Sequence, residues 1–549
     1  MLKLTKNKIL IISNVVIILT LIIFSNLGFL PLENFLIFGF FSVAIFIFAW
    51  WRLRLFFLFF VGIIILENIN LVPAELGVNI RPYQLLGGII FLVFLVKLVL
   101  NKLNFKLPKF CWKDGLILTF ILAGFLSTIF SENQIVSLKQ SIIITSFGLL
   151  YFLFKVFIQN FQDLKKVIPF FLSSSFVVVI YGIWQNWQFM RGSSHFEIMA
   201  GRPNTTFSEP DWLGMFLVFL VASLYILIFK KYYSIKNIFK KGDCLFWFYY
   251  SFLVLTFILL ILTVARSAWL GVGMVTIIYL FLILLESLSV WLELKKGFRF
   301  RIRKNNFFKK IFKNLNWKSF FSQSFIIFST GIISISLVFF LNLTNFELGN
   351  RIQSTGSGKQ EITISCVLMF DMEQNNFLNS SIREIENISE LKKYNCRHIN
   401  LEEIESEELK GNLVTKIYRS DPNVNVRAEV YRKSWREIKG NWILGIGWGN
   451  IGSVLGMDDS DTVLNSSNIF LEVWLGAGIL GIISFMILIF SIFWQGIINF
   501  ISKEDIEKKL FGMFLILGVV AILIPNLFNA GIMLGFLWLF FGVSEMDDF

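Results

Sequence analysis

The sequence predicts an all-α polytopic membrane protein of about 12–14 transmembrane helices, with one large extracytoplasmic loop that contains short helices. Hydrophobic residues make up 56% of the 549 positions and charged residues only 16%, which leaves too little polar surface for a soluble protein of this length. The apolar residues also form long runs, such as 326–341, that are able to cross a hydrocarbon core roughly 30 Å thick. Because that core holds no water, each run must form a helix that satisfies its own backbone.

About fourteen segments have the length and apolarity of membrane helices. Two pairs are weaker, since Arg52 and Arg54 sit between the short second and third runs and only Pro525 and Asn526 split the last two. If either pair is a re-entrant hairpin, the count falls toward twelve. The first segment lacks a small-residue cleavage site, so we expect it to stay attached. The segments are 9–28, 34–50, 53–69, 83–100, 114–130, 136–157, 166–187, 212–229, 244–264, 267–286, 321–341, 467–495, 510–526 and 528–543.

Positive charges predict the orientation, because Lys and Arg accumulate in cytoplasmic loops. If the N-terminus lies inside, the loops on the inner side hold roughly thirty positive charges and the short outer loops hold roughly five. This bias predicts cytoplasmic N- and C-termini and an extracytoplasmic large loop. The same bias accounts for the formal charge of +13, so no nucleic-acid partner is expected.

Loop lengths suggest four regions. Residues 1–200 hold the N-terminal transmembrane helices, and 201–341 hold transmembrane helices with arginine motifs at their outer ends. The large extracytoplasmic loop covers 342–466, and C-terminal transmembrane helices follow over 467–549. A connection of this length is typically functional or disordered. Its acidic middle is compatible with a mobile insertion, and Cys366 and Cys396 within it can form a disulfide or remain two thiols.

Three arginines are placed by this topology at the outer membrane face. Arg202 begins a polar segment that runs to Asp211, Arg266 lies between two apolar helices, and Arg427 begins an amphipathic segment in the large loop. Val430, Trp435 and Ile438 are able to share the apolar face of that segment. The planar guanidinium fork suits phosphate, so three arginines that converge on one cavity would bind a diphosphate-linked lipid.

Two further motifs flank the end of the large loop. Glycines alternate at Gly445, Gly447 and Gly449 before Asn450, and this spacing lets a backbone turn tightly or approach a ligand closely. Ser467 and Asn468 are both able to cap the next helix, and Glu472 one turn inside is costly unless it faces a polar cavity. No Cys-x-x-Cys pair occurs, which argues against a zinc site.

The order of these motifs resembles the O-antigen ligase and O-antigen polymerase superfamily of bacterial membrane glycosyltransferases. The resemblance covers about residues 200 to 485. It rests on the segment Arg202–Asp211, the Thr-x-x-Arg-Ser motif Thr263–Ser267, the helix Arg427–Ile438 leading into Trp442–Asn450, the Ser-Asn-x-x-Leu-Glu helix start Ser467–Glu472, and Gly478–Gly481.

The resemblance implies transfer of a glycan from an undecaprenyl-diphosphate carrier to a lipid or glycan acceptor, at the outer face of the bacterial cytoplasmic (inner) membrane. It implies no cofactor, metal ion or nucleotide sugar. The carrier-linked glycan, the acceptor and membrane lipids are the expected partners. Arg202, Arg266 and Arg427 match the family arginines that hold the diphosphate. Gly445, Gly447, Gly449, Asn450, Ser467, Asn468 and Glu472 are expected to bind substrate.

One departure concerns the general base. Ligases of the family carry a histidine where this chain has Ser467, and a serine is a poor base near neutral pH. His195, in the loop of Arg202, is one substitute, and His398 is the only other histidine. The carboxylates of Glu209, Asp211, Asp461 and Glu472 are further candidates. Among the catalytic candidates we therefore count Glu209, Asp211 and His195 beside the three arginines.

Two other classes of function remain open. A transporter or flippase of lipid-linked sugars would show inverted repeats and ionisable residues at mid-membrane, and neither is evident in the sequence. A catalytically silent cell-envelope scaffold is favoured by the missing histidine. The sequence leaves polymerase and ligase activity undistinguished.

Overall fold

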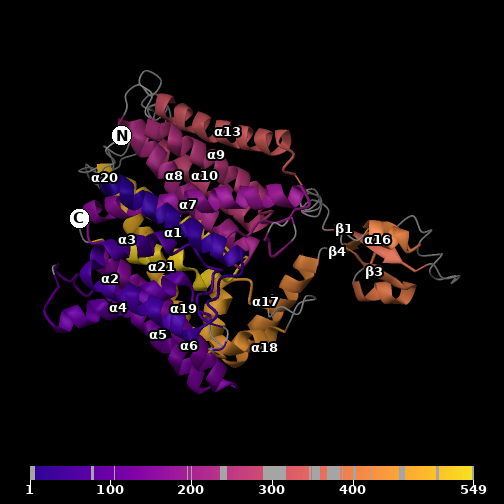
Figure 1. The fold of residues 1–549 in the computed structure, drawn as a ribbon, viewed down its shortest axis with the longest axis horizontal. Coiled ribbons are helices and arrows are strands. Elements are labelled where there is room, and N and C mark those ends of the chain that lie inside the picture. Colours follow the sequence, from indigo (N-terminus) through magenta and orange to yellow (C-terminus); the bar gives the residue numbers. More distant parts are fainter. Residues whose placement is uncertain are drawn as a thin grey trace, which may run out of the picture. The chain divides into compact units, whose positions relative to one another are not determined.

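The computed structural model describes the chain in two compact units, Met1–Leu343 with Ser434–Phe549 and Thr344–Lys433 (Figure 1). Each unit is described by itself. The described residues are 6–546 except 74, 76–78, 104, 194–195, 200, 235–243, 288–316, 345–347, 349–358, 368–383, 386–387, 400–403, 421, 457–463 and 503–505.

The first unit is helical, and 11 of its described helices are long and apolar enough to cross a membrane. This finding confirms the predicted fold class. These 11 are α1 (Lys6–Asn26), α4 (Pro82–Val99), α5 (Trp112–Ile129), α6 (Gln134–Phe157), α7 (Phe161–Met190), α8 (Pro210–Ser234), α9 (Cys244–Leu262), α10 (Arg266–Ser287), α13 (Trp317–Phe340), α19 (Ile469–Ile501) and α20 (Ile506–Asn526). Three shorter apolar helices are α2 (Phe35–Trp51), α3 (Leu53–Ile63) and α21 (Gly535–Val543).

Two predicted spans are shorter than expected. The segment 53–69 forms α3 of only 11 residues, and 528–543 forms a 3-10 turn, η5 (Gly531–Met533), followed by α21 of 9 residues. At about 1.5 Å per residue neither helix reaches across a core roughly 30 Å thick. α21 is nevertheless buried along its whole length, so it fills the interior of the bundle.

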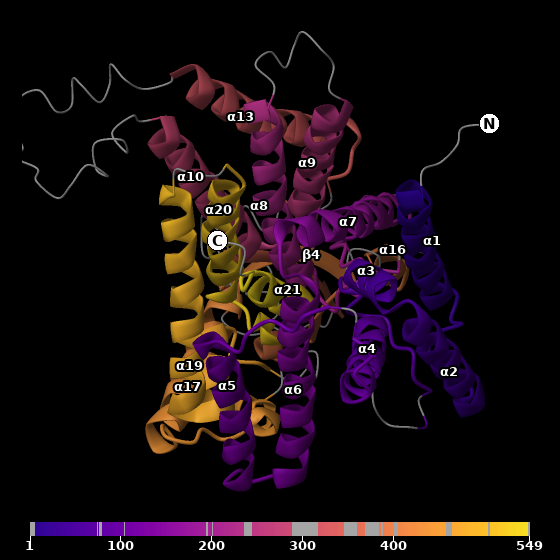
Figure 2. The same cartoon turned by 90° about the vertical axis from the view of Figure 1, so that its left-hand side faces the viewer.

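Burial separates the central helices from the peripheral ones. The apolar window of α8 is 83% buried, whereas that of α1 is only 17% buried. α19 packs along both α5 and α20, and α21 packs against α6, as Figure 2 shows. The polar loops that begin α8, α10 and α19 therefore surround a tightly packed core.

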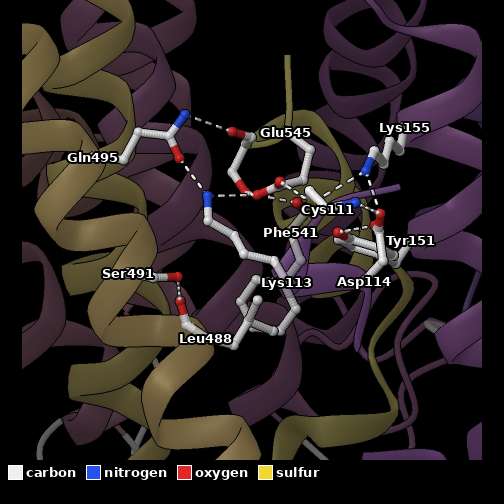
Figure 3. A network of polar contacts seen from close by, with 11 residues as sticks. Cys111, Lys113, Asp114, Tyr151, Lys155, Leu488, Ser491, Gln495, Phe541 and Glu545 are labelled. Carbon is white, nitrogen blue, oxygen red and sulfur yellow. Dashed lines mark hydrogen bonds and ion pairs between the residues drawn. The ribbon is translucent and has the colours of Figure 1, made fainter. Parts of the chain in front are cut away.

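Helices α5 and α6 are fastened at one end by a buried polar cluster (Figure 3). The Asp114 carboxylate accepts hydrogen bonds from the Lys155 ammonium at 2.5 Å and from the Tyr151 hydroxyl at 2.7 Å. It also accepts from the backbone N–H of Cys111 at 2.6 Å, which caps α5. A buried charge is tolerated only when it is paired and hydrogen-bonded, as it is here.

The same end is joined to the C-terminal segment. The Lys113 ammonium donates to Glu545 Oε1 at 2.7 Å and to Gln495 Oε1 at 2.6 Å. The Gln495 amide in turn donates to the Ser544 carbonyl at 3.0 Å. Residues 544–545 are thus tied to both α5 and α19 (Figure 3).

The second unit contains a small sheet that the sequence analysis did not predict. Its strand order is β2-β4-β1-β3, with β1 (Lys359–Cys366), β2 (Glu384–Ile385), β3 (Cys396–His398) and β4 (Leu413–Ser420). β1 is antiparallel to β3 and β4, and β2 is parallel to β4. Ile362, Ile364 and Ile417 form its core beside a Cys366–Cys396 disulfide. The described residues of this acidic middle therefore belong to a compact unit.

Short helices complete this region, as predicted for the large loop. They are η2 (Ile388–Tyr394), α16 (Ile404–Leu409) and α17 (Pro422–Gly440), which continues into the first unit. Val430 and Ile438 are buried along α17, but Trp435 is 46% exposed. The prediction that Trp435 shares their face is wrong, because the buried stripe runs through positions 430, 434 and 438. The Trp435 ring instead meets Trp474 edge-on at 5.9 Å.

Candidate functional site

The loop before α8 is a buried and highly bonded turn. The amide oxygen of Gln185 in α7 accepts from the Thr205 N–H at 2.8 Å, where Thr205 adopts φ +53°. Asn204 accepts from the Ile198 N–H and donates to the Phe207 carbonyl at 2.6 Å. These bonds fix the backbone on both sides of Arg202, whose side chain is only 8% exposed.

Arg202 joins this loop to the second predicted arginine motif. Its Nε donates to the Thr263 carbonyl at 3.1 Å, and its Nη2 lies 3.3 Å from Asp211 Oδ1. Thr263 lies three positions before Arg266, so one hydrogen bond brings the two arginine motifs together. Asp211 is the counter-ion of Arg202 in this arrangement.

Arg266 is the first residue of α10 and is half-buried. The turn that precedes it contains Val264 at φ +54°. α8 begins beside it: a Cβ built on Gly214 would lie 2.8 Å from the Ala268 Cβ and 3.0 Å from that of Ala265. The starts of two helices therefore lie in contact, and helix N-termini favour negatively charged ligands.

The start of α19 is connected to the same region. Asn468 caps α19 by accepting from the N–H groups of Phe470 and Leu471, and its amide donates to the Leu527 carbonyl at 3.1 Å. Two residues further on, the Asn529 amide donates to the Ser267 hydroxyl at 3.0 Å. The segment after α20 thus links the α19 motif to the α10 motif. We call the region where α8, α10 and α19 begin the arginine end.

Ser467 and Glu472 shape the backbone before α19. Glu472 is buried, and its Oε2 accepts from the Ser466 N–H at 2.9 Å. Ser467 adopts φ +49°, and its N–H donates to the Asn465 side chain at 2.9 Å. Asn468, and not Ser467, is the cap. The carboxylate of Glu472 is thus engaged in holding the motif, while the substrate-binding role of all three residues stays a prediction.

The glycine motif is explained by close packing within the first unit. Gly445 (φ +74°) and Gly447 (φ +85°) lie in a turn whose Ile446 N–H donates to the Leu475 carbonyl at 2.7 Å. A Cβ on Gly445 would lie 2.4 Å from that carbonyl oxygen, and one on Gly449 would lie 2.5 Å from the Val136 backbone. The turn leads into η4 (Trp448–Asn450) and α18 (Ile451–Leu455). Its role toward substrate stays a prediction.

Asn450 is buried beside this turn, and its amide donates to the Ile446 carbonyl at 2.9 Å. The remaining candidates are less constrained. Glu209 is half-buried just before α8. His195 and Asp461 lie outside the described residues. Arg427 lies in α17 within the second unit, and His398 lies in β3, exposed on the sheet. The roles proposed for these residues stay predictions.

Sequence reasoning missed Glu197, a carboxylate in the loop of Arg202. Its Oε2 accepts from the Gly201 N–H at 2.9 Å. Burial raises the pKa of Glu197 to about 7, although the hydrogen bond from Gly201 lowers it. A carboxyl group that titrates near neutral pH is suited to general acid–base chemistry. No sequence pattern marks this burial, because it depends on how the loop folds.

A second missed group is the buried ion pair between Glu67 and Arg81, 2.5 Å apart. Glu67 also accepts from the Tyr83 hydroxyl at 2.8 Å and, through Oε1, from the Gly535 N–H at 2.7 Å. The N–H of Glu67 donates to the Thr206 carbonyl at 2.8 Å. The pair therefore holds α4, α21 and the Arg202 loop together. Both residues were visible as charges at the ends of apolar runs.

No cluster of His, Cys, Asp and Glu that could hold a metal ion occurs among the residues that the structure describes. Glu197, Glu209 and Asp211 are the carboxylates of the loop that precedes and begins α8.

Comparisons with known proteins give one match. Residues 251–486 match the family model described as O-antigen ligase, a region that includes Arg266, the second unit, the glycine turn and the start of α19. The Arg202 loop precedes the matched region. Comparisons with curated proteins and with solved structures found no match. The family match indicates an activity of the O-antigen ligase or polymerase type, acting on lipid-linked glycans in a bacterial membrane. Residues 251–486 of this chain are therefore similar to the O-antigen ligase family, which agrees with the resemblance read from the order of the motifs.

Proposed function

We propose that this protein transfers or polymerises an oligosaccharide carried on a lipid diphosphate, at the outer face of the cytoplasmic membrane. The hydrogen bond from Arg202 Nε to the Thr263 carbonyl carries the proposal, because it gathers two arginine motifs at the starts of two helices. Arg202 and Arg266 would hold the diphosphate of the donor. The resemblance implies the same role for Arg427 of α17.

The chemistry needs no group beyond an anion site and a base. The acceptor hydroxyl oxygen attacks the anomeric carbon of the donor sugar, and the bond from that carbon to the diphosphate oxygen breaks. The prenyl diphosphate leaves with the electron pair, and a base takes the hydroxyl proton. Guanidinium groups placed where the leaving charge develops stabilise the transition state, and aligned helix N-termini add to this effect.

Two observations support the outer face. The Lys and Arg residues concentrate in the loops opposite to those that hold Arg202 and Arg266. The second unit contains the Cys366–Cys396 disulfide, and disulfides persist in oxidising compartments outside the cytoplasm. The two arguments are independent, since one rests on charge and the other on redox chemistry.

We assign the role of general base to Glu197. Asp211 is paired with Arg202, so it is not well placed to take a proton. Glu197 lies in the same loop as Arg202, and burial raises its pKa to about 7. Ser467 then has no need to replace the family histidine as a base.

This assignment predicts the pH dependence of activity. A base acts in its carboxylate form, so kcat/KM should rise with pH through about 7 and level off above it. Glu197→Gln should lower kcat about 100-fold and remove that rise. Glu132→Gln, an exposed carboxylate in the loop between α5 and α6, is the control and should behave like the wild type. An unchanged pH profile in Glu197→Gln would assign the base elsewhere.

The proposed function is tested with the purified full-length chain in proteoliposomes. Undecaprenyl-diphosphate-linked oligosaccharide is supplied as the donor. The acceptor is either a second molecule of the same compound or a different lipid-linked sugar. We expect a lengthened or transferred glycan and release of undecaprenyl diphosphate. Lengthening indicates a polymerase and transfer to the second acceptor indicates a ligase. Release of neither product would overturn the proposal.

A further inference from the structure

A large apolar cavity lies between the first four helices of the chain. Its volume is about 830 Å³, and it is lined by α1, α2, α3, α4 and the loops that follow α1 and α3. Thr20 contributes the one polar side chain among 18 lining residues, and seven of the others are phenylalanines. Figure 2 shows these four helices gathered at one side of the first unit. The cavity is partly open, so a chain can enter it from the membrane.

We propose that this cavity holds the isoprenoid chain of the lipid-diphosphate donor. The inference rests on the function proposed above. We infer the occupant from the position of one end of the cavity. At that end Leu71 and Pro82 line the cavity next to the Glu67–Arg81 ion pair. The N–H groups of Glu67 and Asn68 both donate to the carbonyl of Thr206, at 2.8 and 2.7 Å. The cavity therefore ends beside the residues that hold the Arg202 loop.

This continuity matches the two parts of the donor. The diphosphate requires guanidinium groups, and the chain attached to it requires an apolar path that starts nearby. The Thr206 hydroxyl donates to the Ile65 carbonyl at 2.7 Å, and the Leu71 N–H donates to the Ile80 carbonyl at 3.1 Å. These bonds fix the end of the cavity to the Arg202 loop, so both sites keep one relative position.

The cavity volume sets how much chain fits. An apolar cavity of about 150 Å³ holds one benzene molecule, which is close to an isoprene unit in size. A volume of 830 Å³ therefore accommodates roughly five isoprene units, or about half of an undecaprenyl chain. The remaining units extend into the bilayer.

Selection for an isoprenoid must come from shape, because bilayer chains are as apolar as the cavity wall. Phe24 of α1, Phe41 of α2 and Phe59 of α3 present rings to the cavity from three helices. Flat rings pack closely against the methyl branches and double bonds of an isoprenoid, and each added atomic contact contributes dispersion energy. A straight saturated chain makes fewer such contacts.

The experiment fills the cavity and varies the donor chain. Thr20→Trp in α1 and Ile45→Trp in α2 place an indole in the cavity. Ile23→Trp and Val43→Trp on the same helices are the controls, because Ile23 and Val43 are 49% and 58% exposed and lie outside the lining. Each variant is assayed with the same oligosaccharide on undecaprenyl diphosphate and on methyl diphosphate, which has no isoprenoid chain.

We expect cavity filling to raise the KM for the undecaprenyl donor about tenfold and to leave the KM for the methyl diphosphate donor unchanged, because that donor has no isoprenoid chain. The two control variants should match the wild type with both donors. An equal rise for both donors, or no rise for either, would overturn the inference, and the latter would indicate that bulk phospholipid occupies the cavity.

A second measurement does not depend on turnover. Undecaprenyl diphosphate that carries a diazirine on its chain is bound to the wild type and irradiated, and labelled peptides are identified by mass spectrometry. We expect labels on peptides of α1 to α4 that are lost in Thr20→Trp. Labels elsewhere would overturn the cavity assignment. Cavity labels in a protein that transfers no glycan would instead place the failure in the proposed function.

Discussion

Replacing Arg266 by alanine is expected to abolish glycan transfer while the amount of protein in the membrane stays unchanged. Arg266 begins α10 next to the loop of Arg202, where a donor diphosphate would develop charge as it leaves. Removing one group that stabilises such charge typically costs about 10³-fold in kcat. The measurement is glycan release from undecaprenyl diphosphate by the purified variant, together with its level in membranes.

Two further variants separate charge from geometry. Arg266→Lys keeps the positive charge but lacks the planar fork, so it should retain an intermediate activity. Arg191→Ala removes an exposed arginine from the loop that follows α7, where its guanidinium lies 3.7 Å over the Trp187 ring. This control should leave transfer near the wild-type rate. Full activity of Arg266→Ala would sink the diphosphate assignment.

Gly478→Ala should have the largest effect on stability. Gly478 interrupts α19 with φ +61° and ψ −163°. Residues other than glycine hardly ever adopt this backbone conformation. A Cβ there would lie 2.2 Å from the Ile443 carbonyl oxygen and 2.7 Å from the Leu444 Cα. Both are backbone atoms that cannot move aside, and the Ile479 N–H bonds the same carbonyl at 3.0 Å.

We therefore expect Gly478→Ala to lower the free energy of unfolding by about 3 kcal/mol or more, or to prevent folding. The readout is the thermal stability of the detergent-purified protein and its monodisperse fraction. Gly273→Ala in α10 is the matched control, because a Cβ on Gly273 would meet nothing within 4 Å. Equal stability of the two variants would contradict the packing argument for this turn.

Much of the helical framework could be predicted from the sequence, because apolar length alone decides which segments are able to cross a membrane. The exceptions are instructive. The segments that contain α3 and α21 are as apolar as true spans, but the chain turns at Ile63 and Gly535 to place Glu67 in contact with the Gly535 N–H. Only the folded structure shows that contact.

The sheet of the second unit was missed although a signal exists. Apolar Ile362, Ile364 and Cys366 alternate along β1 with polar Thr363 and Ser365, which is the period of a strand. Its partner β4 lies about fifty positions later, so the pairing leaves no local trace. The surrounding acidic residues obscured this short alternation.

The candidate site, like the fold, could be predicted from the sequence only in part. Charge topology placed Arg202 and Arg266 on one side of the membrane, but their closeness depends on one hydrogen bond to a backbone carbonyl. Glu197 could not be recognised, because its raised pKa follows from burial and any exposed glutamate looks the same in a sequence. Residue types are visible in a sequence, whereas desolvation is a property of the fold.

The cluster around Glu545 has a consequence for biosynthesis. Lys113 is synthesised early in translation, but its counter-ion Glu545 follows 432 positions later in the chain. Until then the ammonium of Lys113 has no carboxylate from that segment, and an ionised group in a low-dielectric setting is costly. A ribosome that stops before residue 545 would thus release a chain whose fifth helix exposes an uncompensated charge. Membrane proteases that recognise such charges would be able to distinguish the unfinished chain from the finished one.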